Sequence, residues 1–135
     1  MDSASQSMLR VACLTIAAFT TLSATAAEYS CSVAKKVDAD RQYSAEELAE
    51  LRFSNTIEEV GNQTWVSRCS FARSAGGVTC DRLRMEHVVV DPSVKIKKYY
   101  MFSSQFDFQL YPDLSFVENN GRGGISYGRC RVVSP

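Results

Sequence analysis

Apolar and polar residues alternate over most of the chain after residue 27. The clearest case is the segment 105–110, in which Phe106, Phe108 and Leu110 alternate with Gln105, Asp107 and Gln109. A period of two is typical of a strand with one buried and one exposed face. The same reasoning predicts strands at residues 28–33, 65–72, 78–90, 94–102, 114–117 and 125–133. A polar-rich segment of similar period begins at residue 53 and leads into the strand at 65–72.

Turn signals separate these segments at regular intervals. Asp91-Pro92-Ser93 and Pro112-Asp113 contain the residues that favour turns. Asn120-Gly121 predicts a hairpin, because this dipeptide accepts the positive φ angles of a type I′ turn. About eight short strands with such spacing predict a mainly β protein, a small antiparallel up-and-down β-barrel. A β-sandwich is the alternative architecture.

One short helix is expected near the start of this domain. Ser44 and Glu47 form a capping box, in which each side chain bonds to the backbone of the other residue. Tyr43 and Leu48 have the spacing of a hydrophobic staple around the same helix start. In the strand that follows the turn at residues 73–77, alternation places Leu83, Met85, His87 and Val89 on one face.

Residues 1–27 have the pattern of a cleaved signal peptide. Arg10 precedes an apolar run from Val11 to Leu22, and small residues follow it up to Ala27. The run is too short to cross a membrane, and no second long apolar stretch exists. We therefore expect cleavage after Ala27, a single domain at 28–135 without a transmembrane segment, and export to the periplasm or the medium, in a bacterium.

The four cysteines after residue 27 predict two disulfides in an exported domain. Cys69 and Cys80 flank a turn between two predicted strands, so they can face each other across a hairpin. Cys31 and Cys130 lie in the first and last strands, which become neighbours if the sheet closes. We expect these two pairs, although three pairings are open from sequence alone. No C-x-x-C motif is present, so a zinc site is not expected.

The charges balance overall but not along the chain. Lys and Arg number 15, and Asp and Glu number 15, a balance that argues against a nucleic-acid partner. Residues 64–135 nevertheless carry 10 basic and 6 acidic side chains, an excess of four positive charges. Lys95, Lys97 and Tyr99 could form a face for an anionic partner. The alternative is that these lysines only keep an exposed strand from pairing with another chain.

No catalytic, metal or cofactor motif stands out. His87 is the one histidine, and no nucleophile or carboxylate pattern accompanies it. Residues 36–47 have the spacing of a calcium loop, but Lys36 and Arg41 occupy positions where the loop needs an oxygen ligand and a glycine. Five acids are candidates for sugar hydrolysis, although no pair is singled out: Glu58, Glu59, Asp107, Asp113 and Glu118.

These observations favour a binding protein over an enzyme. The leading hypothesis is an exported, non-catalytic binding or inhibitor-type protein, without a metal or cofactor, whose partner is an unknown protein or glycan of the cell envelope. The alternative is a carrier that holds a small apolar ligand inside the barrel, as eight-stranded barrels can do. A hydrolase that uses carboxylates is a third and weaker hypothesis.

Overall fold

The computed structural model describes residues 26–135, so the predicted signal peptide lies almost entirely outside the described residues. This part of the chain contains nine strands, one α-helix and two short 3₁₀ helices. The α-helix has seven residues, and no helix among residues 26–135 is long and apolar enough to cross a membrane. The elements are β1 Ala26–Val37, α1 Ala45–Leu51, β2 Ser54–Val60, β3 Gln63–Ala72, η1 Arg73–Ala75, β4 Gly77–Arg84, β5 His87–Val90, β6 Lys97–Met101, η2 Phe102–Ser104, β7 Phe106–Leu110, β8 Ser115–Asn119 and β9 Ile125–Ser134.

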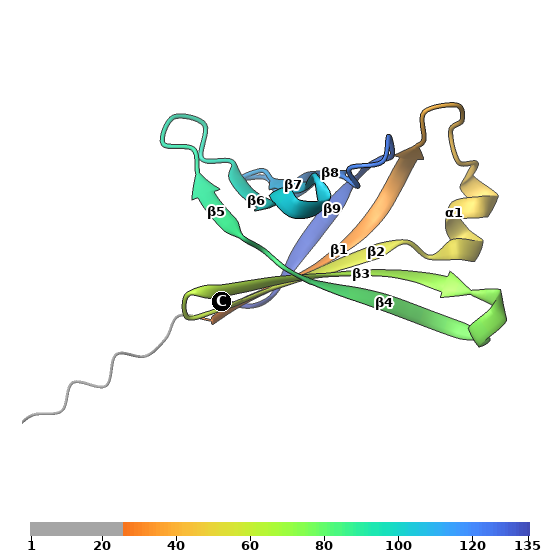
Figure 1. Cartoon of the computed structure of the whole chain (residues 1–135), viewed down its shortest axis with the longest axis horizontal. Helices are drawn as coiled ribbons and strands as arrows, with labels where there is room; N and C mark the ends of the chain where they lie inside the picture. Colours follow the sequence, from red (N-terminus) through yellow and green to blue (C-terminus); the bar gives the residue numbers. More distant parts are fainter. Residues whose placement is uncertain (1–25) are drawn as a thin grey trace, which may run out of the picture.

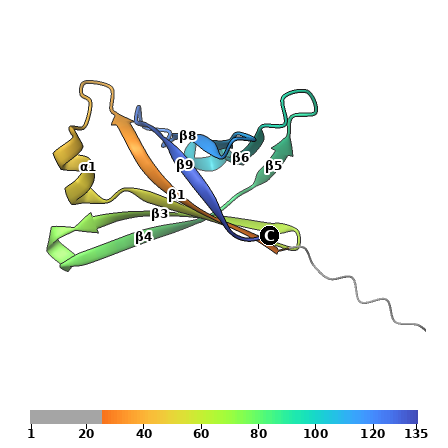
Figure 2. The same ribbon diagram turned by 180° about the vertical axis from the view of Figure 1, so that it is seen from behind.

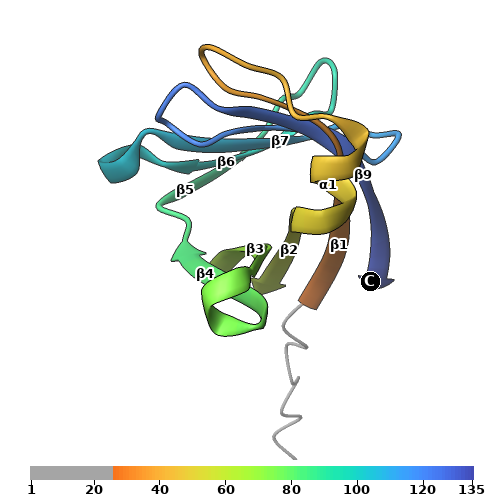
Figure 3. The ribbon, with the colours of Figure 1, turned by 90° about the vertical axis from the view of Figure 1, so that its right-hand side faces the viewer.

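All nine strands belong to one antiparallel sheet, in the order β4-β3-β2-β1-β9-β8-β7-β6-β5. Strands that follow each other in sequence pair with each other, except β4 and β5, which are the two edges of the sheet. In addition β1 pairs with β9, so the first and last strands lie side by side (Figure 2). The sheet curls into a half-barrel, with β3 and β4 diverging from β7, β8 and β9 towards the helix (Figures 1 and 3). The predicted antiparallel β-barrel class is confirmed, in a form that is only partly closed.

The predicted long strand 78–90 is broken into β4 and β5. The amide of Met85 donates to the carbonyl of Thr64 on β3 (2.9 Å), whereas the amide of Glu86 donates to the carbonyl of Tyr100 on β6 (2.8 Å). The chain therefore changes partners between two consecutive residues and links the two edges of the sheet. Met85 is buried but His87 is exposed, so the prediction of one continuous strand with both residues on the same face is wrong.

Helix α1 begins where the capping box predicts. The amide of Glu47 donates to Ser44 Oγ (3.2 Å), and the amide of Ser44 donates to Glu47 Oε2 (2.8 Å). The helix ends at Arg52, which has a left-handed conformation with φ of 49°. Tyr43 packs edge-on against Phe53, with ring centroids 5.4 Å apart. These contacts fix the connection from β1 through α1 to β2.

Both predicted disulfides are confirmed. Cys31 on β1 lies directly opposite Cys130 on β9, and Cys69 on β3 lies directly opposite Cys80 on β4. The first bridge joins residues 99 positions apart and the second joins residues 11 positions apart. The long-range bridge therefore covalently fixes the strand pair that brings the two ends of the domain together.

The hairpin between β8 and β9 is confirmed, but its turn type is not the one predicted. The loop runs from Asn120 to Gly124 and is closed by a bond from the Asn120 amide to the Gly124 carbonyl (3.0 Å). Gly121 has a φ of 74°, whereas Asn120 does not have a positive φ. A type I′ turn needs both, so the tight two-residue turn is replaced by a longer loop.

The centre of the half-barrel is filled by side chains. Strands β2, β3, β6, β7 and β8 each contribute inward-facing residues to it. The largest fully buried side chains are Tyr99, Phe108, Phe116, Ile57 and Val66. Polar side chains replace apolar ones towards both ends of the barrel, and one of these ends forms the site described next.

Candidate binding site

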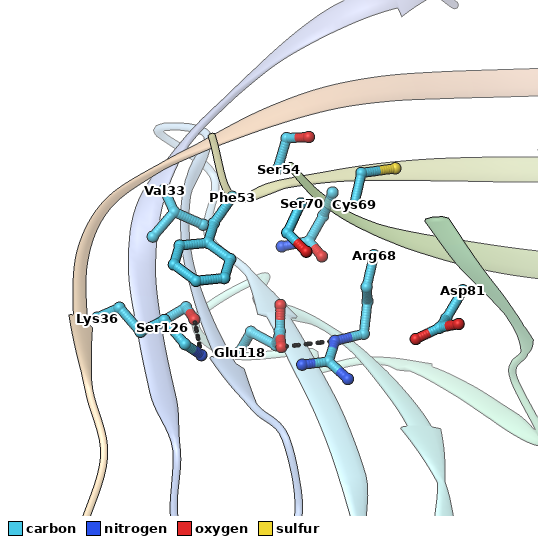
Figure 4. A pocket seen from close by; sticks show the side chains of 11 residues that line it. Val33, Lys36, Phe53, Ser54, Arg68, Cys69, Ser70, Asp81, Glu118 and Ser126 are labelled. Carbon is cyan, nitrogen blue, oxygen red and sulfur yellow. Dashed lines mark hydrogen bonds and ion pairs between the residues drawn. The ribbon is translucent and has the colours of Figure 1, made fainter. Parts of the chain in front are cut away.

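A polar pocket of about 110 Å³ lies on the concave face of the sheet, where the strands diverge (Figure 4). Its walls come from β1, the segment after α1, and strands β2, β3, β4, β8 and β9. Hydroxyl, amide, carboxylate and cationic groups dominate the lining. The lining residues are Val33, Lys36, Phe53, Ser54, Asn55, Arg68, Cys69, Ser70, Asp81, Glu118 and Ser126.

Strand register explains why several of these side chains meet. Asn55 on β2 lies opposite Cys31 on β1 and opposite Arg68 on β3, and Arg68 lies opposite Asp81 on β4. Residues directly opposite each other in a sheet share a face. Cys31 is buried, so this row of residues lies on the concave face.

A β-bulge in β1 places Lys36 in the pocket. Val33 pairs with Gly128 and Lys35 pairs with Tyr127, so Ala34 is an extra residue on β1. The bulge reverses the alternation, and Lys36 points inward beside its partner Ser126 while Lys35 remains exposed.

Gly128 allows the close approach of the strands at the bulge. A Cβ atom at this position would clash with the carbonyl oxygen of Ser32 and with the ring of Phe116. The absence of a side chain is therefore part of the local structure that orients Lys36.

Lys36 is a buried cation without a carboxylate partner. Lys36 is only 7% exposed, and its Nζ donates to Ser126 Oγ at 3.4 Å. The Phe53 ring centroid lies 5.1 Å from the same Nζ. Lys36 forms no ion pair with any acidic side chain of residues 26–135. Burying a charge without compensation is costly, so this arrangement is unusual for a purely structural lysine.

Asn55 is the second group with an unused donor. The residue is 2% exposed, and its Nδ2 has no hydrogen-bond partner. Among residues 26–135 it is the one buried side-chain nitrogen or oxygen in this condition. An unsatisfied buried donor costs about 1–3 kcal/mol, and such atoms in native structures call for an explanation.

Arg68 and Glu118 form an ion pair across the concave side of the barrel. Arg68 Nε on β3 donates to Glu118 Oε1 on β8 at 2.9 Å, and Glu118 is 3% exposed. The guanidinium also lies 5.5 Å from the centroid of the Phe106 ring. Because Arg68 and Glu118 pair with each other, two charges of the lining have no ion-pair partner: the buried Lys36 and the exposed Asp81 (Figure 4).

A larger, open groove of about 450 Å³ adjoins the pocket and shares Arg68 and Asp81 with it. One wall is β4, which is an edge strand of the sheet. The opposite wall comes from the chain around η2 and β7 and from the loop between β8 and β9. The remaining lining residues are Cys80, Arg82, Leu83, Ser104, Phe106, Asn120 and Arg122.

The residues predicted as an anionic-partner face lie elsewhere. Lys97 and Tyr99 point into the other end of the barrel, where Lys97 Nζ and Tyr99 Oη donate to Glu59 at 2.8 and 2.6 Å. Lys95 lies outside, in the turn before β6, with a φ of 60°. The structure therefore brings Lys97 and Tyr99 together but separates Lys95 from them.

The cluster at Glu59 changes the chemistry of Tyr99. Burial raises the pKa of the Tyr99 hydroxyl well above its ordinary value, and the hydrogen bond to the Glu59 carboxylate raises it further. Tyr99 thus remains a neutral donor over the physiological pH range. Its role in this arrangement is to join β6 to β2 across the barrel.

The five candidate carboxylates each have a local partner. Glu58 pairs with exposed Arg82, and Glu59 and Glu118 form the ion pairs described above. Asp107 accepts from Gln109, and Asp113 accepts from Ser115 in a turn. His87 is exposed near the Phe102 ring. Among residues 26–135, no group of three or more His, Cys, Asp or Glu side chains has the arrangement of a metal site.

Lys36 and Asn55 were missed as site residues by the sequence analysis. Lys36 was considered only as a residue that spoils a calcium loop, and Asn55 lies in a polar-rich segment without a clear motif. Lys36 points inward because Ala34 is an extra residue on β1, and this bulge cannot be recognised without the register of β1 against β9.

Comparison with protein-family models, curated proteins and solved structures found no match for this chain.

Proposed function

We propose that this chain is an exported, non-catalytic binding protein of the inhibitor type, which takes one projecting group of a partner protein into the polar pocket. The observation that carries the proposal is a pair of buried groups in the pocket: Lys36, which has no ion-pair partner, and Asn55, whose Nδ2 has no hydrogen-bond partner. Groups of this kind cost stability in the free protein, and a bound partner can compensate them.

The size of the pocket favours a projecting group over a whole small molecule. One water molecule needs about 10–15 Å³ of such a space, so a pocket of about 110 Å³ holds about ten water molecules at most, or one functional group. Sites for whole small molecules usually occupy about 300–1,000 Å³. The rest of the ligand must therefore lie outside, in the adjoining groove.

The groove has features suited to a protein partner. Its wall strand β4 lies at the edge of the sheet, so its outer backbone groups are available to an extended segment of another chain. Arg82 lines the wall that β4 forms, and Arg122 lies exposed on the opposite wall. Arginine side chains are enriched where proteins bind each other.

The filled centre of the barrel favours this proposal over a carrier of apolar ligands. Tyr99, Phe108 and Phe116 are fully buried there and occupy the space that a carrier would keep open. The pocket at Lys36 and Asn55 is lined mainly by polar groups.

The two disulfides support a location outside the cytoplasm, because such bonds persist in oxidising compartments. Export through residues 1–27, in a bacterium, remains part of the proposal.

The test is affinity capture from envelope extract with three baits, each purified with both disulfides formed. Arg122→Glu reverses one charge at the groove, and Arg131→Glu makes the same change on β9, outside the pocket and the groove. We expect the unchanged protein and Arg131→Glu to capture the same protein, and Arg122→Glu to capture at least tenfold less of it.

Arg131→Glu is a matched control, because it alters the net charge of the protein by the same amount as Arg122→Glu. Equal capture by the two variants would place the contact elsewhere and contradict the proposed site. Recovery of a lipid or another apolar small molecule from the purified protein, without any protein partner, would support a carrier instead.

A further inference from the structure

The geometry points to a carboxylate as the group that enters the pocket, held by Lys36, Asn55 and Ser126, and contributed by the partner protein. This inference rests on the proposed function, because it names the chemistry of the partner group. Donors from three different strands line the same small space: Lys36 on β1, Asn55 on β2 and Ser126 on β9.

The buried charge of Lys36 favours an anion. Lys36 is buried and has only the neutral Ser126 hydroxyl as a hydrogen-bond partner. A carboxylate placed against Lys36 Nζ would pair this charge, and buried ion pairs are shorter and stronger than neutral hydrogen bonds. A cationic group would be repelled by Lys36, and a neutral carbonyl would leave the charge uncompensated.

The unpaired amide of Asn55 adds a geometric requirement. Its Nδ2 can only donate, so the group that satisfies it must present an acceptor. A carboxylate has two oxygens with several lone pairs, and it can accept from an ammonium and an amide at once. Ser126 Oγ already accepts from Lys36, so its own hydroxyl proton is free to be donated to the same anion.

Glu118 does not cancel this preference. Its carboxylate is held by Arg68 Nε at 2.9 Å, and the two charges compensate each other. Asp81 lies exposed at the side of the pocket that meets the groove, where water screens its charge. One unpaired positive charge remains, which matches the single charge of a carboxylate better than the greater charge of a phosphate monoester.

The experiment is a titration of the isotope-labelled protein, followed by NMR, with sodium acetate against sodium chloride at equal ionic strength. We expect saturable shifts of the Asn55 side-chain amide and the Ser126 backbone amide with acetate, in the millimolar range, and none with chloride. Saturable shifts at these groups with chloride, or no saturable shift with acetate, would overturn the inference.

Three further ligands distinguish the sources of the carboxylate. N-acetyl-aspartate amide carries a side-chain carboxylate, N-acetyl-alanine carries a chain-terminal carboxylate, and glucuronate represents an acidic glycan. We expect one of the two amino-acid ligands to bind more tightly than acetate, and N-acetyl-asparagine amide, a neutral isostere, to give no saturable shift. Tighter binding of glucuronate than of both amino-acid ligands would overturn the protein source.

Two variants and one control locate the site. Lys36→Met replaces a buried charge by an apolar side chain of similar length, and it removes the cost of burying that charge. We expect it to weaken acetate binding at least tenfold, whereas Lys35→Met, a change at the exposed neighbour, leaves binding unchanged. Asn55→Asp replaces the donor by an anion of the same shape and is expected to abolish binding. Unchanged affinity in a folded Lys36→Met or Asn55→Asp protein would contradict the assignment.

The two proposals fail in different ways. If a partner is lost with Arg122→Glu but no carboxylate binds in the titration, the proposed function stands and the carboxylate inference is wrong. If acetate binds through Lys36 but no partner depends on Arg122, the pocket takes free carboxylates and the proposed function is wrong.

Discussion

Tyr99 shows how single residues hold the curled sheet together at the end opposite the pocket. Its side chain is fully buried, and its hydroxyl donates to Glu59 at 2.6 Å, beside the ion pair between Glu59 and Lys97. Glu59 lies on β2, whereas Tyr99 and Lys97 lie on β6. These two strands are far apart in the order of the sheet. The cluster therefore bridges the interior of the half-barrel.

Tyr99→Phe is expected to reduce stability in a way that depends on pH. The raised pKa of Tyr99 means that its contribution is fully present below the ordinary tyrosine pKa of 10.0 and is lost as the pH rises above it. A hydrogen bond to a charged group contributes about 1.5–3 kcal/mol, so we expect a loss of about 2 kcal/mol near neutral pH. The difference between the two proteins should shrink by about 1.4 kcal/mol for each pH unit above 10.

Urea unfolding, followed by the fluorescence of Trp65, measures this difference across the alkaline range. Other lysines and tyrosines titrate there in both proteins, so only the difference between them is informative. A stability difference that stays constant from neutral pH to one unit above 10 would contradict the role assigned to Tyr99.

Lys35 and Lys36 illustrate what the sequence could not reveal at this scale. The two residues are identical in chemistry and adjacent, yet one is exposed and the other is buried in the pocket. Strict alternation would place Lys35 on the same face as Cys31 and Val33. The extra residue at Ala34 reverses this, and the bulge depends on pairing with a strand about 90 residues away, as the 90-residue separation of Lys36 and Ser126 shows.

At the scale of elements, strand pairs and disulfides reinforce each other. Cys31–Cys130 fastens β1 to β9, and Cys69–Cys80 fastens β3 to β4. The first bridge is buried, whereas Cys80 of the second lies exposed on the edge strand. The two bonds therefore differ in their access to a reductant, although both lie across neighbouring antiparallel strands.

A mild thiol reductant is expected to open the two disulfides in sequence. Thiol–disulfide exchange requires access of the attacking thiolate to a sulfur atom, so Cys69–Cys80 should be reduced first in the folded protein. Alkylation followed by peptide mass spectrometry should find label on Cys69 and Cys80 while Cys31 and Cys130 remain paired. In concentrated urea this order should disappear, and simultaneous labelling of all four cysteines under native conditions would contradict the burial of the long-range bridge.

Elements were the most predictable level of this structure. Alternation located the strands and the capping box located the helix, because both signals are local. The cysteine pairing followed from the positions of the strands on which they lie. The break at Met85 was missed, since the alternation continues through it and only the exchange of partners from β3 to β6 ends the strand.

At the scale of the whole molecule, the curl of the sheet makes the candidate site. Arg68 and Glu118 are 50 residues apart in sequence and lie on strands β3 and β8, yet the curl brings them to 2.9 Å. Local patterns do not specify how strongly a sheet curls or which polar residues then face each other. The pocket, its unpaired donors and the open groove were therefore outside what the sequence could predict.

The most direct measurement of the central claim is photo-crosslinking in cells that produce the protein. A photoreactive residue replaces Ser104 at the groove or, as the control, Arg131 on β9, and each is tested with and without Lys36→Met. We predict one discrete protein adduct from position 104, which is lost when Lys36 is replaced, and no such adduct from position 131. An adduct at 104 that persists without Lys36, or the same adduct from 131, would contradict binding in the pocket.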